Sequence, residues 1–176
     1  MNLNKIPAGE NIPNDIYVII EISAFSKPIK YEINKQTGVI FVDRIMYSTM
    51  FYPCNYGFIN KTLSSDGDPI DALVITPYPI QAGSVIRCRP VGMLNMTDEM
   101  GEDNKIIAVP HQTLTEVYQN TKDINDIPPI LKNQIIHFFK YYKKLDAKKW
   151  STIEGWENAK ASQNEICTAV QRALLK

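Results

Sequence analysis

The chain has 176 residues with 19 basic and 19 acidic side chains, so its formal net charge is zero. That length suits one domain with one core, expected over residues 1–176, and the 44% hydrophobic content argues against disorder. General nucleic-acid and membrane-surface binders usually carry a basic excess, so the balanced charge argues against both classes.

The first two thirds of the chain is predicted to consist of short strands. Residues 29–33 alternate, so that Lys30 and Glu32 share one face, and residues 34–38 form a turn before the next strand. The full set of expected strands is residues 16–22, 29–33, 39–44, 56–60, 70–76, 84–96 and 105–109. Many short strands separated by turns predict a mainly β fold, a small barrel or sandwich.

The last third is predicted to be helical. Asp126 is the expected N-cap of a first helix, because prolines are tolerated in the turn that follows. Its apolar side chains recur at helical spacing, and Phe138, Phe139 and Tyr141 cover more of the circumference than one core-facing stripe needs. We therefore expect part of this face to lie between subunits. A second helix is expected over about residues 158–174.

The cysteines and the N-terminal segment indicate the cellular compartment of the protein. The three cysteines are widely spaced and contain no C-x-x-C pair, which argues against a disulfide framework or a zinc site. Residues 1–7 lack the apolar core of a signal peptide, and no apolar run approaches membrane-spanning length. We therefore expect a cytoplasmic protein.

Two acidic segments carry the strongest chemical signal. Residues 66–71 place three acids within six positions of a turn rich in Gly and Pro, and residues 98–103 form a second cluster. Carboxylates crowded this closely repel, and hard divalent cations, which prefer oxygen ligands, remove the conflict. The first segment alone is equally well explained as a solvated acidic turn, and the second alone is more often solubilising surface. At one end of a barrel, however, the two could together hold more than one metal.

Basic and aromatic residues make the acidic segments interpretable. Lys30 and Arg44 lie on neighbouring predicted strands, Lys105 follows the second acidic segment, and Lys143 follows the first helix. Carboxylates that bind metal, mixed with cations that bind phosphate oxygens, suit phosphoryl chemistry. The aromatic segment over residues 50–58 is expected to place Phe51 and Phe58 in the core and tyrosine hydroxyls in a polar cleft.

These segments together resemble the soluble family I inorganic pyrophosphatases of the bacterial type. The resemblance rests on residues 29–32, 42–44, 51–57, 66–71, 98–105 and 142–143, in the same order and spacing. It implies an OB-like five-stranded β-barrel plus two C-terminal α-helices. It also implies an Mg²⁺-dependent hydrolase that cleaves pyrophosphate into two phosphates by direct in-line attack of a metal-activated water. A homohexamer and a role in phosphate metabolism are implied as well.

The same resemblance implies a role for each site residue. Several Mg²⁺ ions per site, with Mn²⁺ or Zn²⁺ as substitutes, would be held by Asp66, Asp71, Asp98 and Asp103. Glu21, Glu32 and Glu99 would support the site or act through metal-bound waters. Pyrophosphate would be bound by Lys30, Arg44, Tyr56, Lys105, Tyr142 and Lys143. Catalysis would rest on Asp68, which makes the nucleophile, together with Tyr56 and Arg44.

Two other classes of function stay open at the level of residues alone. One is a nucleic-acid-binding OB module that stacks bases on Tyr52, Tyr56 and Phe58. Its acidic loops would repel a phosphate backbone unless metals were present. The other is a divalent-cation buffer, which explains the acids but leaves the separated cations without a role.

Overall fold

The computed structural model describes residues 2–175, in which nine strands and two α-helices form the main elements. The strands are β1 (Ile16–Ile22), β2 (Ile29–Ile33), β3 (Ile40–Ile45), β4 (Asn55–Ile59), β5 (Asp71–Val74), β6 (Val85–Asp98), β7 (Gly101–Glu102), β8 (Lys105–Pro110) and β9 (Ser151–Asn158). The helices are α1 (Pro129–Tyr141) and α2 (Ala159–Leu174), with short 3-10 helices at Leu3–Lys5 and Ile124–Asp126. Every predicted strand is confirmed, whereas β7 and β9 were not predicted.

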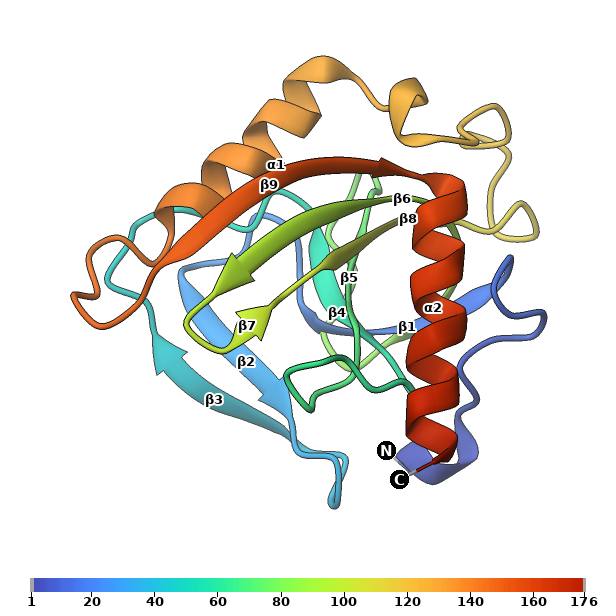
Figure 1. The fold of residues 1–176 in the computed structure, drawn as a ribbon, viewed down its shortest axis with the longest axis horizontal. Coiled ribbons are helices and arrows are strands. Elements are labelled where there is room, and N and C mark those ends of the chain that lie inside the picture. The colour runs from blue at the N-terminus through green and yellow to red at the C-terminus, as the bar shows by residue number, and fades with distance from the viewer. Residues whose placement is uncertain (1, 176) are drawn as a thin grey trace.

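Five of the strands close into a ring. Each strand pairs with the next in the order β1, β4, β5, β8 and β6, and β6 pairs back to β1. β7 and β9 both extend the sheet from β6, while β2 and β3 form a separate two-stranded sheet beside the ring (Figure 1). The predicted mainly β fold, with an OB-like set of five strands and two flanking helices, is confirmed.

Close backbone approaches and a bulge allow the ring to close. The register of β6 against β8 shifts between Pro90 and Gly92, so the long β6 strand can bend and serve several partners. A Cβ atom at Gly57 on β4 would lie only 1.9 Å from the carbonyl oxygen of Ile19 on β1. Glycine at position 57 therefore lets these two strands pair.

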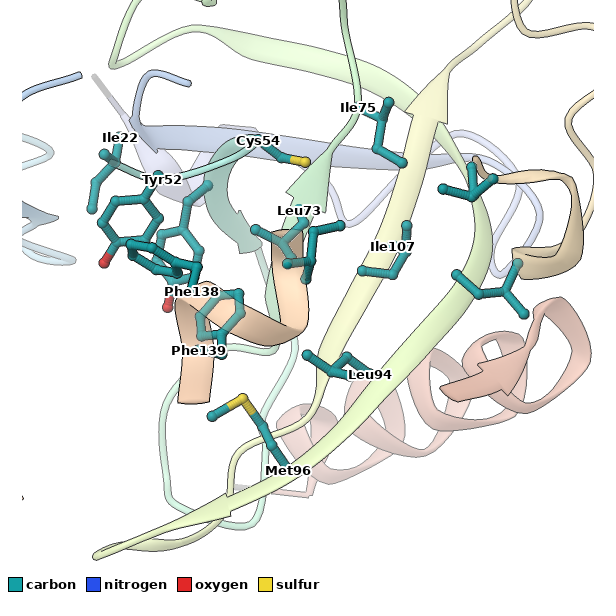
Figure 2. Packing of buried hydrophobic residues seen from close by; sticks show 14 of the residues in the cluster. Ile22, Tyr52, Cys54, Leu73, Ile75, Leu94, Met96, Ile107, Phe138 and Phe139 are labelled. Atoms are coloured by element: carbon teal, nitrogen blue, oxygen red, sulfur yellow. The ribbon is translucent and has the colours of Figure 1, made fainter. Parts of the chain in front are cut away.

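The helices cover opposite faces of the ring strands. One buried cluster contains Phe138 and Phe139 from α1 packed against Leu73 on β5 and Ile107 on β8 (Figure 2). The other cluster contains Ile166 and Ala169 from α2 with Ala72, Val74, Ile106 and Ala108. Neighbouring residues on one strand thus point to different helices, which explains why β5 and β8 read as continuous apolar runs.

Three expectations about individual residues need correction. Asp126 is not the N-cap of α1, because Asp123 caps the short 3-10 helix before it and Pro128 precedes α1. Phe51 is 54% exposed rather than buried, although Phe58 is buried as predicted. Phe138 and Phe139 are buried within this chain, so neither is free for a subunit contact.

The second helix begins where the sequence placed it. The Asn158 side chain accepts a hydrogen bond from the backbone N–H of Ala161, which caps the first turn of α2. Over residues 2–175, no helix is both long and apolar enough to cross a membrane.

Candidate functional site

One cavity of about 410 Å³ opens beside the ring, and it gathers the residues that the sequence singled out. Its walls come from β1, from the β2–β3 hairpin, from β4, from the two acidic loops and from the chain after α1. Every predicted site residue lines it: Glu21, Lys30, Glu32, Arg44, Tyr56, Asp66, Asp68, Asp71, Asp98, Glu99, Asp103, Lys105, Tyr142 and Lys143.

Sheet topology brings the two acidic loops together. Asp71 and Lys105 begin the parallel strands β5 and β8 and stand directly opposite each other in register. The second loop is the turn between β6 and β7, where Asp98 pairs with Gly101, whose φ of +118° favours glycine. The expected meeting of both loops at one end of the strand ring is therefore confirmed.

The ammonium group of Lys105 lies between two carboxylates inside the cavity. Its Nζ donates to Asp71 Oδ2 at 2.5 Å and to Asp103 Oδ1, and the side chain is only 2% exposed. The Tyr56 hydroxyl donates to the same Asp71 oxygen at 2.5 Å. One positive charge thus serves two negative ones, so this part of the cavity keeps a negative charge without a partner.

The pKa values of this group follow from that imbalance. Burial raises the pKa of Asp103 to about 6, because Lys105 is shared with Asp71 and offsets the burial only in part. Burial alone would lower the pKa of Lys105, but the carboxylates of Asp71 and Asp103 outweigh it and raise that pKa. Lys105 therefore stays charged at neutral pH.

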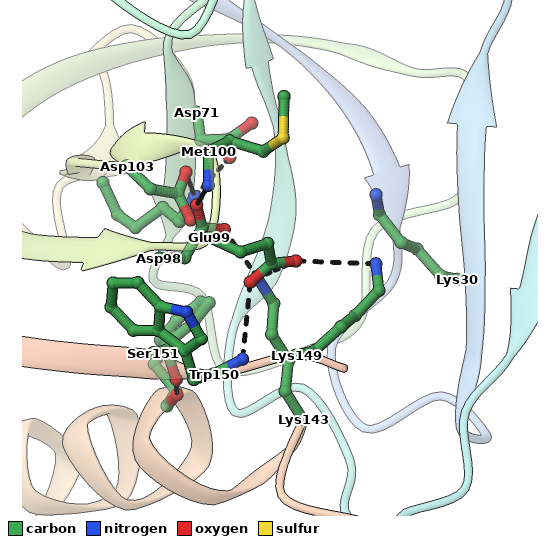
Figure 3. A network of polar contacts seen from close by, with 12 residues as sticks. Lys30, Asp71, Asp98, Glu99, Met100, Asp103, Lys143, Lys149, Trp150 and Ser151 are labelled. Atoms are coloured by element: carbon green, nitrogen blue, oxygen red, sulfur yellow. Dashed lines mark hydrogen bonds and ion pairs between the residues drawn. The ribbon is translucent and has the colours of Figure 1, made fainter. Parts of the chain in front are cut away.

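A second lysine holds the other acidic loop. Lys143 Nζ donates to Asp98 Oδ2 at 2.6 Å and lies 3.3 Å from Glu99 Oε2, as Figure 3 shows. Burial alone would raise the pKa of Asp98, but the hydrogen bond from Lys143 holds it below its usual range. Lys149 approaches the opposite oxygen of Glu99 at 3.7 Å. This side of the cavity is therefore balanced in charge, unlike the side around Lys105.

The tyrosines of the site stay protonated. Burial raises the pKa of Tyr56 and of Tyr142 well above the usual range, so both act as neutral hydroxyl donors. Their rings belong to an aromatic cluster: Phe138 stacks on Tyr142 with centroids 4.9 Å apart and contacts Tyr52 at 4.5 Å. The packing of α1 therefore fixes the direction in which Tyr142 and the following Lys143 face.

The donor set fits a hard divalent cation, although the predicted metal ligands do not form a ready cluster. Within residues 2–175, no three acidic, histidine or cysteine side chains converge closely enough to hold an ion. Instead, Lys105 and Lys143 divide the carboxylates between them. The cavity offers carboxylate oxygens, and the shared ammonium at Lys105 leaves one of them without a counter-charge. Oxygen ligands and surplus negative charge are what Mg²⁺ prefers.

The sequence interpretation missed two lysines that line the cavity. Lys149 follows α1 and pairs with Glu99, while Lys35 in the β2–β3 turn lies near Glu21. No sequence pattern separates either from an ordinary surface lysine. Tyr52 and Phe58 are each only 2% exposed, so they cannot offer ring faces to bases, which removes the stacking platform of the nucleic-acid alternative.

Buried acids make the stability of the metal-free protein depend on pH. Burial raises the pKa of Glu21 to about 7 from an unfolded value near 4.5. The folded protein thus binds more protons than the unfolded chain between these values, so the free energy of unfolding should fall as pH rises through this window. Chemical denaturation at about pH 5 and about pH 8, with a chelator present, measures this.

Two controls define that expectation. Glu21→Gln should flatten the dependence over this window, because the amide does not titrate. Mg²⁺ should stabilise the protein more at the higher pH, where the carboxylates are ionised. A free energy of unfolding that rises from pH 5 to pH 8 would contradict the raised pKa of Glu21.

The chain is similar to known proteins over nearly its whole length. Residues 18–174 match the family model described as inorganic pyrophosphatase. The chain is 61% identical over 173 residues to the inorganic pyrophosphatases of Yersinia pestis and Escherichia coli K12, covering 98% of this chain and 99% and 98% of theirs. It superposes on an inorganic pyrophosphatase structure from Helicobacter pylori with a TM-score of 0.92 at 41% identity, covering 97% of this chain and 99% of that one.

Proposed function

Because the chain belongs to the inorganic pyrophosphatase family and hydrolyses pyrophosphate to phosphate, we propose that it does so in the cytoplasm with Mg²⁺ as cofactor. Residues 1–176 would act as one domain, and Mn²⁺ or Zn²⁺ would substitute for Mg²⁺. The observation that carries the proposal is that two acidic loops and six cations, from segments far apart in sequence, line one cavity.

The metal ligands are proposed from the carboxylates of the two loops. Asp66 and Asp71 on one loop and Asp98 and Asp103 on the other would hold the ions, with Glu21, Glu32 and Glu99 in supporting positions. When bound, the ions would neutralise phosphate charge and acidify the attacking water. Binding would also supply the counter-charge that Lys105 alone does not provide for Asp71 and Asp103.

The cations and hydroxyls of the chain would bind the substrate. Lys30 and Arg44 approach from the hairpin, while Lys105 and Lys143 lie at the acidic loops, so positive charge surrounds the cavity. Tyr56 and Tyr142 would donate hydrogen bonds to phosphate oxygens, because burial keeps both hydroxyls protonated. Donors fixed before the reaction stabilise the developing charge without reorganising.

The chemical step is proposed as one in-line displacement with Asp68 as the base. Asp68 is exposed to the cavity, and its backbone N–H donates to Asp66 Oδ1 at 3.0 Å, which holds the loop in shape. A water oxygen forms a bond to one phosphorus as its proton passes to the Asp68 carboxylate. The bridging P–O bond breaks, and its electron pair leaves on the second phosphate, where cations stabilise it.

The direct test is phosphate release from pyrophosphate by the pure protein. With Mg²⁺ present, we expect two phosphates to be released per pyrophosphate. A chelator should stop phosphate release, and added Mg²⁺ should restore it. A cation buffer would bind Mg²⁺ without any phosphate release. Failure to release phosphate near neutral pH with excess Mg²⁺ would overturn the proposal.

We propose a homohexamer for the assembly, supported by apolar side chains that the monomer leaves exposed. Val42, Ile45 and Tyr47 on or after β3 are 59%, 73% and 73% exposed. Sedimentation should give a mass of about six chains of 20.0 kDa each. Ile45→Glu should shift the protein to smaller species, whereas the matched control Val117→Glu, at an equally exposed apolar position, should not. A monomeric mass for the unaltered protein at micromolar concentration would contradict the hexamer.

A further inference from the structure

The β2–β3 hairpin carries Lys30 and Arg44, yet their charges do not tie it to the ring. Lys30 pairs with Glu32 and lies 3.7 Å from Asp43, and Arg44 lies 3.3 Å from the same Asp43 oxygen. All of these partners belong to the hairpin itself. For the part of the chain that the structure describes, no ion pair joins a residue of β2 or β3 to a ring strand.

Apolar packing of Ile33 and Ile40 on Ile19 and Phe58 holds the tip of the hairpin against the ring, and polar contacts add to it at one place. Glu21 on β1 accepts a hydrogen bond from the backbone N–H of Ile33 at 2.7 Å, where β2 ends. Two residues later, Lys35 Nζ lies 3.6 Å from the same Glu21 oxygen. That ammonium also sits 3.5 Å from the centroid of the Phe58 ring on β4.

These contacts join the turn of the hairpin to two ring strands, β1 and β4, through one cation. Phe58 is buried and belongs to the small cluster formed with Ile19 and Ile33, so its ring cannot move to follow a displaced ammonium. A cation that lies over an aromatic face and near a carboxylate is held by two attractions at once. Although 43% of the Lys35 side chain is exposed, its charged end is fixed.

We propose that Lys35 is a positioning residue: clamped between Phe58 and Glu21, it pins the hairpin tip to the ring and so sets the place of Lys30 and Arg44. The inference rests on the proposed role of those two residues in binding pyrophosphate. Because Lys35 positions Lys30 and Arg44, which bind the substrate, and does not contact the base, it affects substrate affinity more than the chemical step.

The test compares Lys35→Met with Lys35→Arg at about pH 8, above the Glu21 pKa of about 7, where its carboxylate is ionised. Methionine keeps the length and the contact with the ring but loses the charge, so KM for pyrophosphate should rise about tenfold while kcat changes by less than about twofold. Arginine keeps both the charge and the ring contact, so Lys35→Arg should have nearly the same KM as the unaltered protein. The matched control Lys160→Met removes an exposed lysine on α2, outside the cavity, and should leave KM unchanged.

Two further measurements separate positioning from other roles. Calorimetric binding of imidodiphosphate, a pyrophosphate analogue, should weaken by the same factor as KM rises. In the background of Glu21→Gln, Lys35→Met should raise KM by a smaller factor than in the unaltered protein, because the clamp has already lost its carboxylate and keeps only the Phe58 ring. Independent, multiplying effects would show that Lys35 acts on the substrate directly, and would overturn the clamp.

The outcomes also separate this inference from the proposed function. An unchanged KM in Lys35→Met, or a fall in kcat at constant KM, overturns the role of Lys35 while the unaltered protein still releases phosphate. Absence of phosphate release from the unaltered protein overturns the proposed function itself.

Discussion

Asp68→Asn is expected to lower kcat by about 100- to 10,000-fold at saturating Mg²⁺, the loss typical of a positioned acid–base group. Asparagine matches aspartate in size and keeps the loop hydrogen bond, because that bond uses the backbone N–H of residue 68. It cannot accept a proton from the attacking water. The measurement is kcat across a range of Mg²⁺ concentrations, with the pH–rate profile recorded alongside.

The neighbouring acids of the same loop provide the matched controls. Asp66→Asn and Asp71→Asn should raise the Mg²⁺ concentration needed for activity and weaken Mg²⁺ binding measured directly by calorimetry. Asp71 differs further, because Tyr56 and Lys105 both donate to its Oδ2 atom. A near-normal kcat for Asp68→Asn at saturating Mg²⁺ would remove its role as base. Loss of metal affinity alone in all three variants would favour a simple acidic patch.

Lys105→Met should damage both activity and stability. Removing the ammonium leaves the Asp71 and Asp103 carboxylates side by side without their shared partner, at a position only 2% exposed. Breaking a buried ion pair from one side typically costs about 3–5 kcal/mol of stability. Loss of one electrostatic donor to the phosphates would lower kcat by about 100- to 1000-fold.

A bound Mg²⁺ ion should replace part of the positive charge that Lys105→Met removes from beside Asp71 and Asp103. Denaturation without metal should show the full loss, and added Mg²⁺ should recover more stability in Lys105→Met than in the unaltered protein. Lys148→Met, which removes an exposed lysine beyond α1, is the control and should be close to neutral. Equal stability of Lys105→Met and the unaltered protein without metal would contradict the shared ion pair.

Local patterns along the chain were sufficient for most of the elements, and for the two acidic segments and the separated cations that line the cavity. The roles of individual residues rest on the family resemblance. Apolar runs, alternation over residues 29–33 and turn residues placed the strands that became β1 to β6 and β8, and Asn158 marked the start of α2. The acidic segments and the separated cations could be recognised because their chemistry is carried by residue type and short spacing. The predicted strands and turns are found in the structure because turn residues and strand periodicity depend on only a few neighbouring residues.

Contacts between distant segments depended on the tertiary structure alone. Lys105 meets Asp71, 34 residues away, because β5 and β8 pair in parallel, and no local pattern encodes that register. The same holds for Lys35 at Phe58 and for Phe51, whose exposure its aromatic neighbours do not indicate. Residue type specifies which groups can bind metal or phosphate. Strand pairing specifies which carboxylates share a lysine, since their separation in space is set by long-range hydrogen bonding and packing.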